Sequence, residues 1–258
     1  MKQHSTAIID PKAEIGADVD IGPYAVIERD VAIGEGCRIG PHAVIHPYTT
    51  LGPGCRVHAG AVLGDAPQEI AFSGCRSFVR IGARCILREG VTIHRGTEED
   101  TATRIGDECF LMVNSHVGHN CQVGNKVIMA NGALLGGRVH VGDGVFIAGN
   151  SGVHQFVKIG RLAMLSGVAG ASKDVPPFCT IHGATINKIS GLNVIGMRRA
   201  GIGPADRSEV KRVFKLICAS GLNVSQALEE LEAQDLAGPA KEFVDFVKTS
   251  SRGICQMG

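Results

Sequence analysis

A six-residue period runs through most of this 258-residue chain and limits what it can fold into. From Ile15 the sequence reads IGADVD, IGPYAV, IERDVA, IGEGCR and IGPHAV. An aliphatic residue opens each unit, Gly often comes second, and a small or β-branched residue comes fifth. A helix needs apolar residues about every 3.6 positions and an amphipathic strand needs them every second position. A strict period of six fits neither, so it predicts short strands joined by turns.

This repeat resembles that of the hexapeptide-repeat family, whose chains wind a left-handed parallel β-helix with three hexapeptides, hence 18 residues, per coil. The resemblance implies a mainly β fold, with a β-helix domain over residues 1–190. Segments 65–78 and 95–104 leave the repeat and return in register, so we expect loops that project from the coil. The acidic run Glu98 to Asp100 is expected to be solvated. Because Pro cannot donate to a strand ladder, Pro176 and Pro177 predict that the coil ends near them.

The last part of the chain has a helical pattern. Residues 204–221, 225–234 and 238–251 carry apolar residues at helical spacing, which predicts a small helical domain within 191–258, with Ser225 as a helix cap. Its first stretch is basic, through Arg198, Arg199, Arg207, Lys211, Arg212 and Lys215. Such a run is either a solvated helix face or a docking surface for an acidic partner.

Composition restricts the class of partner and the compartment. The chain has 26 Lys and Arg residues against 25 Asp and Glu residues, a net charge of +1, so no overall field favours nucleic acid or an anionic membrane. No signal peptide or run of about 18 apolar residues is evident, so we expect a cytoplasmic protein without a membrane span. Five of the nine cysteines fall at the fifth place of the repeat, which predicts small buried side chains: Cys37, Cys55, Cys85, Cys109 and Cys121.

Coil arithmetic gathers polar residues on one stripe. If 18 residues return the chain to the same corner about 4.8 Å along the axis, His119 stacks beneath Gly137 and Gln155. In the same way Gly118 stacks beneath Gly136 and His154, and Asn120 stacks beneath Arg138. The stripe interrupts the hexapeptide consensus, which a scaffold alone would not require.

Five motifs carry a closer resemblance. VTIHRGT (91–97), NSHVGHNCQVGN (114–125), GVHQF (152–156), KDVPPF (173–178) and GLNVIGMRRAG (191–201) resemble the UDP-N-acetylglucosamine O-acyltransferase family, which begins lipid A synthesis. The resemblance implies a homotrimer that binds its substrates between neighbouring coils and needs no metal or cofactor. An acyl carrier protein would deliver a 3-hydroxyacyl thioester, and the acyl chain would pass to the glucosamine 3-hydroxyl.

The resemblance also assigns roles. An alcohol is a poor nucleophile at neutral pH, so a base must take its proton, and imidazole suits that task. His119 matches the family's catalytic base, and the backbone N–H of Gly137 matches its oxyanion donor. Gly167 matches the position that limits acyl length. The predicted substrate contacts are Gln68, Glu69, His116, Arg138, His154, Gln155, Asn193 and Arg199.

Several positions depart from the family pattern. Asn120 replaces an acid beside the base, and Arg138 replaces a histidine. The other departures are Glu69 for Asp, Ala71 for Lys, Ile195 for an acidic residue, and Ala200 after a shifted arginine pair. We hypothesise that Arg138 either replaces the missing electrostatics or recognises an altered acceptor. A paralogue that acylates another nucleotide sugar or an amino-sugar is therefore an alternative.

Two other classes of protein stay open. A γ-class carbonic anhydrase uses the same coil and binds zinc through three histidines, and His94, His116, His119 and His154 could supply them. An inactive trimeric scaffold is the other. Acyl length, the identity of the acceptor and the choice between carrier-protein and coenzyme A donors are also left open.

Overall fold

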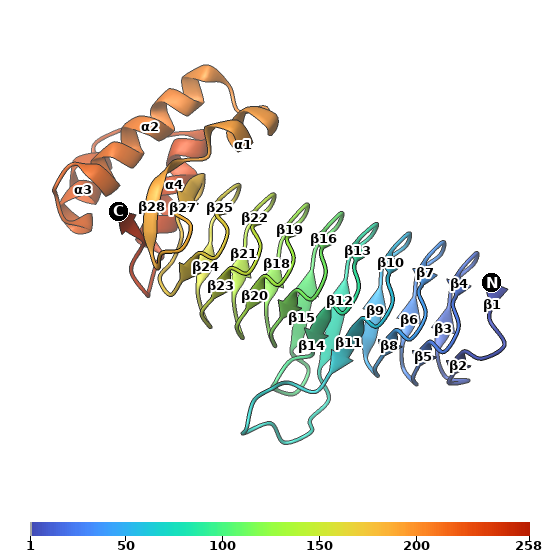
Figure 1. Ribbon diagram of the computed structural model, residues 1–258. Coiled ribbons are helices and arrows are strands. Elements are labelled where there is room, and N and C mark those ends of the chain that lie inside the picture. Colours follow the sequence, from blue (N-terminus) through green and yellow to red (C-terminus); the bar gives the residue numbers. More distant parts are fainter. Residues whose placement is uncertain (1) are drawn as a thin grey trace.

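The computed structural model describes residues 2–258, as a stack of short strands that leads from the N-terminus to a helical unit at the other end (Figure 1). The strands form three sheets, here named A, B and C, in which neighbours come from successive coils. Together they make a left-handed parallel β-helix, so the predicted fold class is confirmed.

Each sheet takes one short strand from almost every coil. Sheet A contains β1 (Lys2–Gln3), β4 (Asp20–Ile21), β7 (Arg38–Ile39), β10 (Arg56–Val57), β13 (Ile86–Leu87), β16 (Phe110–Leu111), β19 (Ile128–Met129), β22 (Phe146–Ile147), β25 (Met164–Leu165), β27 (Cys179–Ile181), β28 (Lys188–Leu192) and β29 (Gln256–Met257). Sheet B contains β2 (Ile8–Ile9), β5 (Val26–Ile27), β8 (Val44–Ile45), β11 (Val62–Asp65), β14 (Thr92–His94), β17 (His116–Val117), β20 (Leu134–Leu135), β23 (Gly152–Val153) and β26 (Gly170–Ala171). Sheet C contains β3 (Glu14–Ile15), β6 (Ala32–Ile33), β9 (Thr49–Leu51), β12 (Phe78–Ile81), β15 (Ala102–Ile105), β18 (Gln122–Val123), β21 (His140–Val141) and β24 (Lys158–Ile159).

The strand registers follow the 18-residue coil. His116 pairs with Leu134, and Leu134 pairs with Gly152. Successive side chains of a strand point to opposite faces, so one residue of each pair faces the interior and the other faces out. Val117 and Leu135, the inward members, are fully buried.

The fifth-place cysteines are buried inside the coil, as predicted. Each thiol donates to the carbonyl of a glycine on the next coil; the Cys85 Sγ to Gly106 O and Cys121 Sγ to Gly136 O distances are both 3.1 Å. Burial contributes to raising the pKa of the Cys121 thiol to about 12. All nine cysteines are free, and these five act as small interior side chains.

The two interruptions of the repeat project together from the coil (Figure 1). They span 66–77, between β11 and β12, and 95–101, between β14 and β15. Arg76 links them, because its guanidinium lies 2.7 Å from Asp100 Oδ1 and 3.6 Å from Glu99 Oε1. Glu98 pairs with Arg138 at 2.6 Å. The run Glu98 to Asp100 is exposed to solvent, as expected, and each of its carboxylates also has an arginine partner.

The coil does not end at Pro176 and Pro177, contrary to the prediction. Pro177 occupies a turn against Gly160, where no ladder donor is needed, and β27 then pairs with β25. β28 folds back antiparallel to β27, and β29, at the end of the chain, pairs with β28. The C-terminal segment therefore returns to the coil.

The helical unit contains α1 (Val194–Arg199), α2 (Pro204–Ala219), α3 (Val224–Glu232) and α4 (Gly238–Lys248). The three longer helices match the predicted segments, whereas α1 was not predicted. The cap of α3 is Asn223, not Ser225: Asn223 Oδ1 accepts from the N–H of Gln226 at 2.9 Å, and the N–H of Asn223 donates to Gln226 Oε1. Within residues 2–258, no helix combines the length and the apolar character needed to cross a bilayer.

Candidate active site

A cleft of about 820 Å³ runs along the outer face of sheet B beside the projecting loops. Its lining combines a cluster of polar side chains with bare glycine backbone and a few apolar side chains. The polar members are Gln68, Glu69, His94, His116, His119, His154, Gln155 and Ser172. The cleft therefore brings together, within one chain, most of the residues on the predicted stripe.

His119 and Gly137 occupy the same place on adjacent coils. The N–H of Arg138 donates to the carbonyl of His119 at 2.7 Å, and the N–H of Phe156 donates to the carbonyl of Gly137 at 3.0 Å. A Cβ on Gly137 would overlap the imidazole of His119, so the ring lies directly over this glycine. Among the hydrogen bonds of residues 2–258, the N–H of Gly137 has no acceptor. An imidazole and an available backbone donor are thus adjacent at the cleft wall.

Asn120 fixes the tautomer of this imidazole. Its Oδ1 lies 3.0 Å from His119 Nδ1 and accepts bonds from the N–H of Thr97 at 3.0 Å and the Thr97 hydroxyl at 2.9 Å. Its Nδ2 donates to Thr101 Oγ1 at 3.0 Å. Because Oδ1 can only accept, the proton between the two residues belongs to His119 Nδ1. Nε2 of His119 is therefore the unprotonated, basic nitrogen of the neutral ring.

His94 and His116 form the inner wall beside this base. Their rings meet edge to face with centroids 4.8 Å apart, and His116 Nδ1 lies 2.8 Å from Thr92 Oγ1. Burial, reinforced by the neighbouring histidines, lowers the pKa of His116 to about 4. Burial also lowers the pKa of His94. Both rings are therefore neutral near pH 7, and each has one N–H donor and one acceptor nitrogen.

The outer wall of the cleft is more exposed. Glu69, from the 66–77 loop, places Oε2 4.0 Å from His119 Nε2. Gln68 comes from the same loop, whereas His154 and Gln155 come from the coil above Gly137. A substrate group bound in the cleft would therefore lie among a carboxylate, amides and imidazoles, beside His119.

Arg138 lies outside this cleft. Its guanidinium pairs with Glu98, donates to Thr97 Oγ1 at 3.2 Å, and lies 5.7 Å from the centre of the Phe156 ring. Arg138 therefore contacts the hydroxyl that bonds Asn120, and reaches His119 only through that network. Its expected role as a substrate contact stays a prediction.

Thr97 and Thr101 were not singled out from the sequence. Thr97 closes the VTIHRGT motif, but the motif gave it no role, because its partner Asn120 is 23 residues away. Thr103 was also missed; its hydroxyl accepts from the N–H of Asn120 at 2.8 Å. The recurrence of threonine around the second interruption was the available signal.

The sequence matches two family profiles. One, for the second domain of UDP-N-acetylglucosamine O-acyltransferase, covers residues 174–255; the other, the bacterial transferase hexapeptide of six repeats, matches 12–47, 30–65 and 102–137. The acyl-(acyl-carrier-protein)–UDP-N-acetylglucosamine O-acyltransferase of Anaeromyxobacter dehalogenans strain 2CP-1 is 44% identical over 256 residues, which cover 98% of this chain and 99% of the relative. The chain belongs to this acyltransferase family.

Further relatives of the acyltransferase family agree. The Herminiimonas arsenicoxydans protein of the same name is 43% identical over 257 residues, 97% of this chain and 98% of the relative. The structure of LpxA from Acinetobacter baumannii has a TM-score of 0.92 at 38% identity, covering 98% of this chain and 99% of that chain. An Arabidopsis UDP-N-acetylglucosamine acyltransferase superposes with a TM-score of 0.86 at 31% identity, over 98% of this chain and 99% of that chain.

Three residues assigned from the acyltransferase family lie away from the cleft. Gly167 is exposed at the corner between sheets A and B, whereas His119 is at the corner between B and C. Asn193 caps α1 and donates to the carbonyl of Leu162 at 2.9 Å, and Arg199 is exposed at the end of α1. The single chain does not bring these three residues to His119.

The histidines near the cleft do not form a metal site. Within residues 2–258, no three His, Cys, Asp or Glu side chains are arranged to hold a metal ion. His94, His116 and His119 are close, but Thr92 and Asn120 engage the Nδ1 atoms of the last two.

Proposed function

We propose that this chain transfers a 3-hydroxyacyl group from an acyl carrier protein to the 3-hydroxyl of UDP-N-acetylglucosamine, the first step of lipid A synthesis. The names of its relatives support the substrates. The observation that carries the chemistry is the His119 imidazole lying over Gly137, with its Nδ1 proton held by Asn120.

The reaction follows from this arrangement. Nε2 of His119 takes the proton of the sugar hydroxyl while its oxygen attacks the thioester carbonyl. The tetrahedral oxyanion accepts a hydrogen bond from the N–H of Gly137. As the carbon–sulfur bond breaks, the His119 imidazolium returns its proton to the departing thiolate, so the base is restored.

Asn120 orients the ring but brings no charge. In the usual arrangement an acid stabilises the imidazolium that forms during attack, whereas an amide oxygen supplies only a dipole. Thr97 donates twice to that oxygen and holds it in place. Glu69 is the carboxylate that remains beside Nε2, and we assign it to the site together with Gln68, His116, His154 and Gln155 as substrate contacts.

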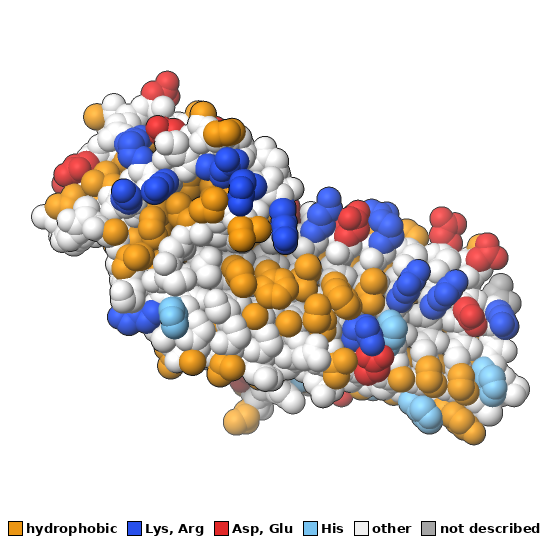
Figure 2. All heavy atoms as spheres, turned by 45° about the horizontal axis from the view of Figure 1, so that its top comes forward, with side chains coloured by type: hydrophobic (Ala, Val, Ile, Leu, Met, Phe, Trp, Pro, Cys, Tyr) orange, Lys and Arg blue, Asp and Glu red, His pale blue; other side chains and the backbone are white. Residues whose placement is uncertain are grey.

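We also propose that the site is completed by a neighbouring subunit of a homotrimer. Asn193 and Arg199 lie away from His119 in one chain, but a second chain packed against sheet B could present them. Figure 2 shows hydrophobic side chains gathered along the coil beside the helical unit. The outward row of sheet A supplies such side chains at Phe110, Ile128, Phe146 and Met164, which are only partly buried in one chain. An assembly would cover this row.

An acyl-transfer assay tests the proposal. Carrier proteins loaded with 3-hydroxyacyl chains of several lengths, and the matching coenzyme A thioesters, are offered UDP-N-acetylglucosamine and its 3-amino analogue. We expect ester formation from carrier-protein donors and its loss in His119→Ala, by about 10²–10⁴-fold. Transfer only to the 3-amino analogue would show that the acceptor is an amino-sugar. No transfer to either acceptor would favour an inactive scaffold.

A further inference from the structure

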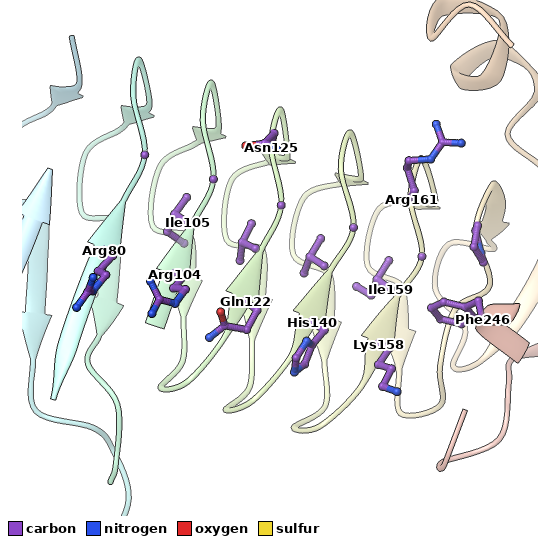
Figure 3. Close-up of a pocket in the computed structure, with 18 of the residues that line it drawn as sticks. Arg80, Arg104, Ile105, Gln122, Asn125, His140, Lys158, Ile159, Arg161 and Phe246 are labelled. Carbon is purple, nitrogen blue, oxygen red and sulfur yellow. The ribbon is translucent and has the colours of Figure 1, made fainter. Parts of the chain in front are cut away.

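A row of polar side chains, among them the cations Arg80, Arg104 and Lys158, runs along the outer face of sheet C, next to the face that carries the cleft. The registers pair Arg80 with Arg104, Arg104 with Gln122, Gln122 with His140, and His140 with Lys158. We call these five residues the basic ladder. Figure 3 shows them projecting to the same side from successive strands. At about 4.8 Å per rung, the ladder is about 19 Å long.

The ladder lines a groove of about 780 Å³. One side is bare backbone, because the residue after each sheet C strand is glycine in all five of these coils: Gly82, Gly106, Gly124, Gly142 and Gly160. Phe246 of α4 and the pair between Arg161 and Glu242, 2.7 Å apart, close the end near the helical unit. The groove is therefore narrow and runs along the coil axis.

The charges of the ladder are not balanced by the protein. Within residues 2–258, no carboxylate oxygen comes within 4.0 Å of the charged nitrogens of Arg80, Arg104 or Lys158. Arg80 lies over the Phe78 ring at 5.3 Å, and Lys158 Nζ donates to the carbonyl of Thr249 at 3.1 Å. Arg80 and Arg104 are like charges on neighbouring strands, an unfavourable pairing that folding alone gives no reason to select.

The nearby acids are engaged elsewhere. Asp107 and Asp143, beyond the glycine row, accept from the backbone N–H groups of Ala83 and Asn125 at 2.7 Å each. Asp174 is buried and accepts from the N–H of Lys158 and the hydroxyl of Ser250. On the first coils the same outward positions are Glu14, Ala32 and Thr50, so the basic character is confined to the coils that also carry the cleft.

We propose that the basic ladder docks an acidic α-helix of a partner protein, laid along the coil axis. Carboxylates at helical spacings of three and four residues recur every 4.5–6 Å or so, close to the rung spacing, and about 13 residues span the ladder. The row is one side chain wide and lies in a groove, which suits a rod better than a flat lipid surface. Phe246 offers an apolar contact at one end.

The test uses the full-length protein and two synthetic helical peptides of identical composition. One carries four glutamates on one face, at positions i, i+4, i+7 and i+11; the other has the same glutamates spread around the helix. Fluorescence anisotropy near physiological salt should show the aligned peptide binding about tenfold more tightly, as exposed charge pairs with the three cationic rungs Arg80, Arg104 and Lys158 would give. Equal affinities would overturn the proposal, because they would mean a nonspecific charge effect.

Variants assign the binding to the ladder. Arg104→Glu should abolish the preference for the aligned peptide. Arg104→Gln should weaken it about threefold, because it removes one charge and leaves the neutral side chain that the next rung already has. Lys12→Glu makes the same charge change at an exposed turn of the first coil and should have no effect. Circular dichroism should show that each variant is folded. Acyl transfer should be unchanged, because the ladder residues lie outside the cleft. Retained preference in Arg104→Glu, or ladder-dependent binding of phosphatidylglycerol vesicles in place of the peptide, would refute the assignment.

Discussion

At the scale of single residues, His119 and Gly137 depend on each other. The imidazole occupies the space that any side chain at 137 would need, and the N–H of Gly137 is one coil away from the base. The same stacking that builds the scaffold thus places the proposed base and the proposed oxyanion donor side by side. The glycine is required by the position of the ring, not by backbone strain.

Gly137→Ala tests this dependence. We expect the methyl group to displace the imidazole and lower kcat by about 10²–10³-fold, comparable to losing an oxyanion donor. Gly149→Ala is the matched control, because its Cβ would meet only the carbonyl of Asn131 at an ordinary 3.4 Å. Steady-state kinetics and thermal unfolding of both variants would measure the effect. Full activity in Gly137→Ala would mean that the ring does not work from this position.

His116 makes stability depend on pH. Its pKa is lowered to about 4 in the folded protein, so between its ordinary pKa and about 4 the unfolded chain binds a proton that the fold does not. Folding stability must therefore fall as pH falls through this window. The shift corresponds to at most about 3 kcal/mol, and to less for this partly exposed ring. Urea midpoints at about pH 7 and pH 4.5 should differ more in the wild type than in His116→Asn; equal differences would contradict the assignment.

At the scale of elements, the 95–101 loop supports the orientation of His119. Thr97 holds Asn120, and Arg138 holds Thr97 and Glu98. The loop therefore connects an exposed ion pair to the orientation of His119. Its residues reach the site through contacts between distant parts of the chain.

Arg138→Met should expose that connection. Methionine keeps the length and loses the charge and the hydrogen bonds, so we expect kcat to fall about three- to tenfold, the effect of one charge-assisted hydrogen bond, with KM unchanged. Arg76→Met, which breaks the pair with Asp100 at the far side of the same loop, is the control and should change neither value. A rise in KM for the sugar alone would instead show that Arg138 recognises the acceptor.

The elements also show how far the sequence could predict this molecule. The period of six determines the coil and its columns, because stacking at 18 residues is a geometric consequence of the repeat; hence His119 over Gly137 was predictable. The three longer helices follow from their apolar spacing. The six-residue α1 is too short to show a period, and Thr97 reaches Asn120 through loop closure that no local pattern encodes. Pro177 misled the prediction because its turn needs no donor.

At the scale of the whole molecule, the proposed trimer makes the site a shared one. His119 would come from one subunit, and Arg199 from its neighbour. His119→Ala and Arg199→Ala should each be impaired. Co-expressed in equal amounts, they should recover about a quarter of wild-type activity, because random assembly then places both intact residues at one site in four. No recovery in mixed assemblies would place the whole site within one chain.

The two ends of the β-helix differ in how their last strands are covered. A parallel β-stack that stopped with bare edges would offer its N–H and C=O groups to the next molecule, the route by which edge strands polymerise into fibres. At the C-terminal end, β28 reverses direction and β29 covers it, so that rim of sheet A cannot be extended in register. At the N-terminal end, β1, β2 and β3 have the same two-residue length as most strands of the coil, so each offers only a short edge. Short strands throughout the coil and the returning tail on sheet A limit the backbone that the stack offers to another molecule.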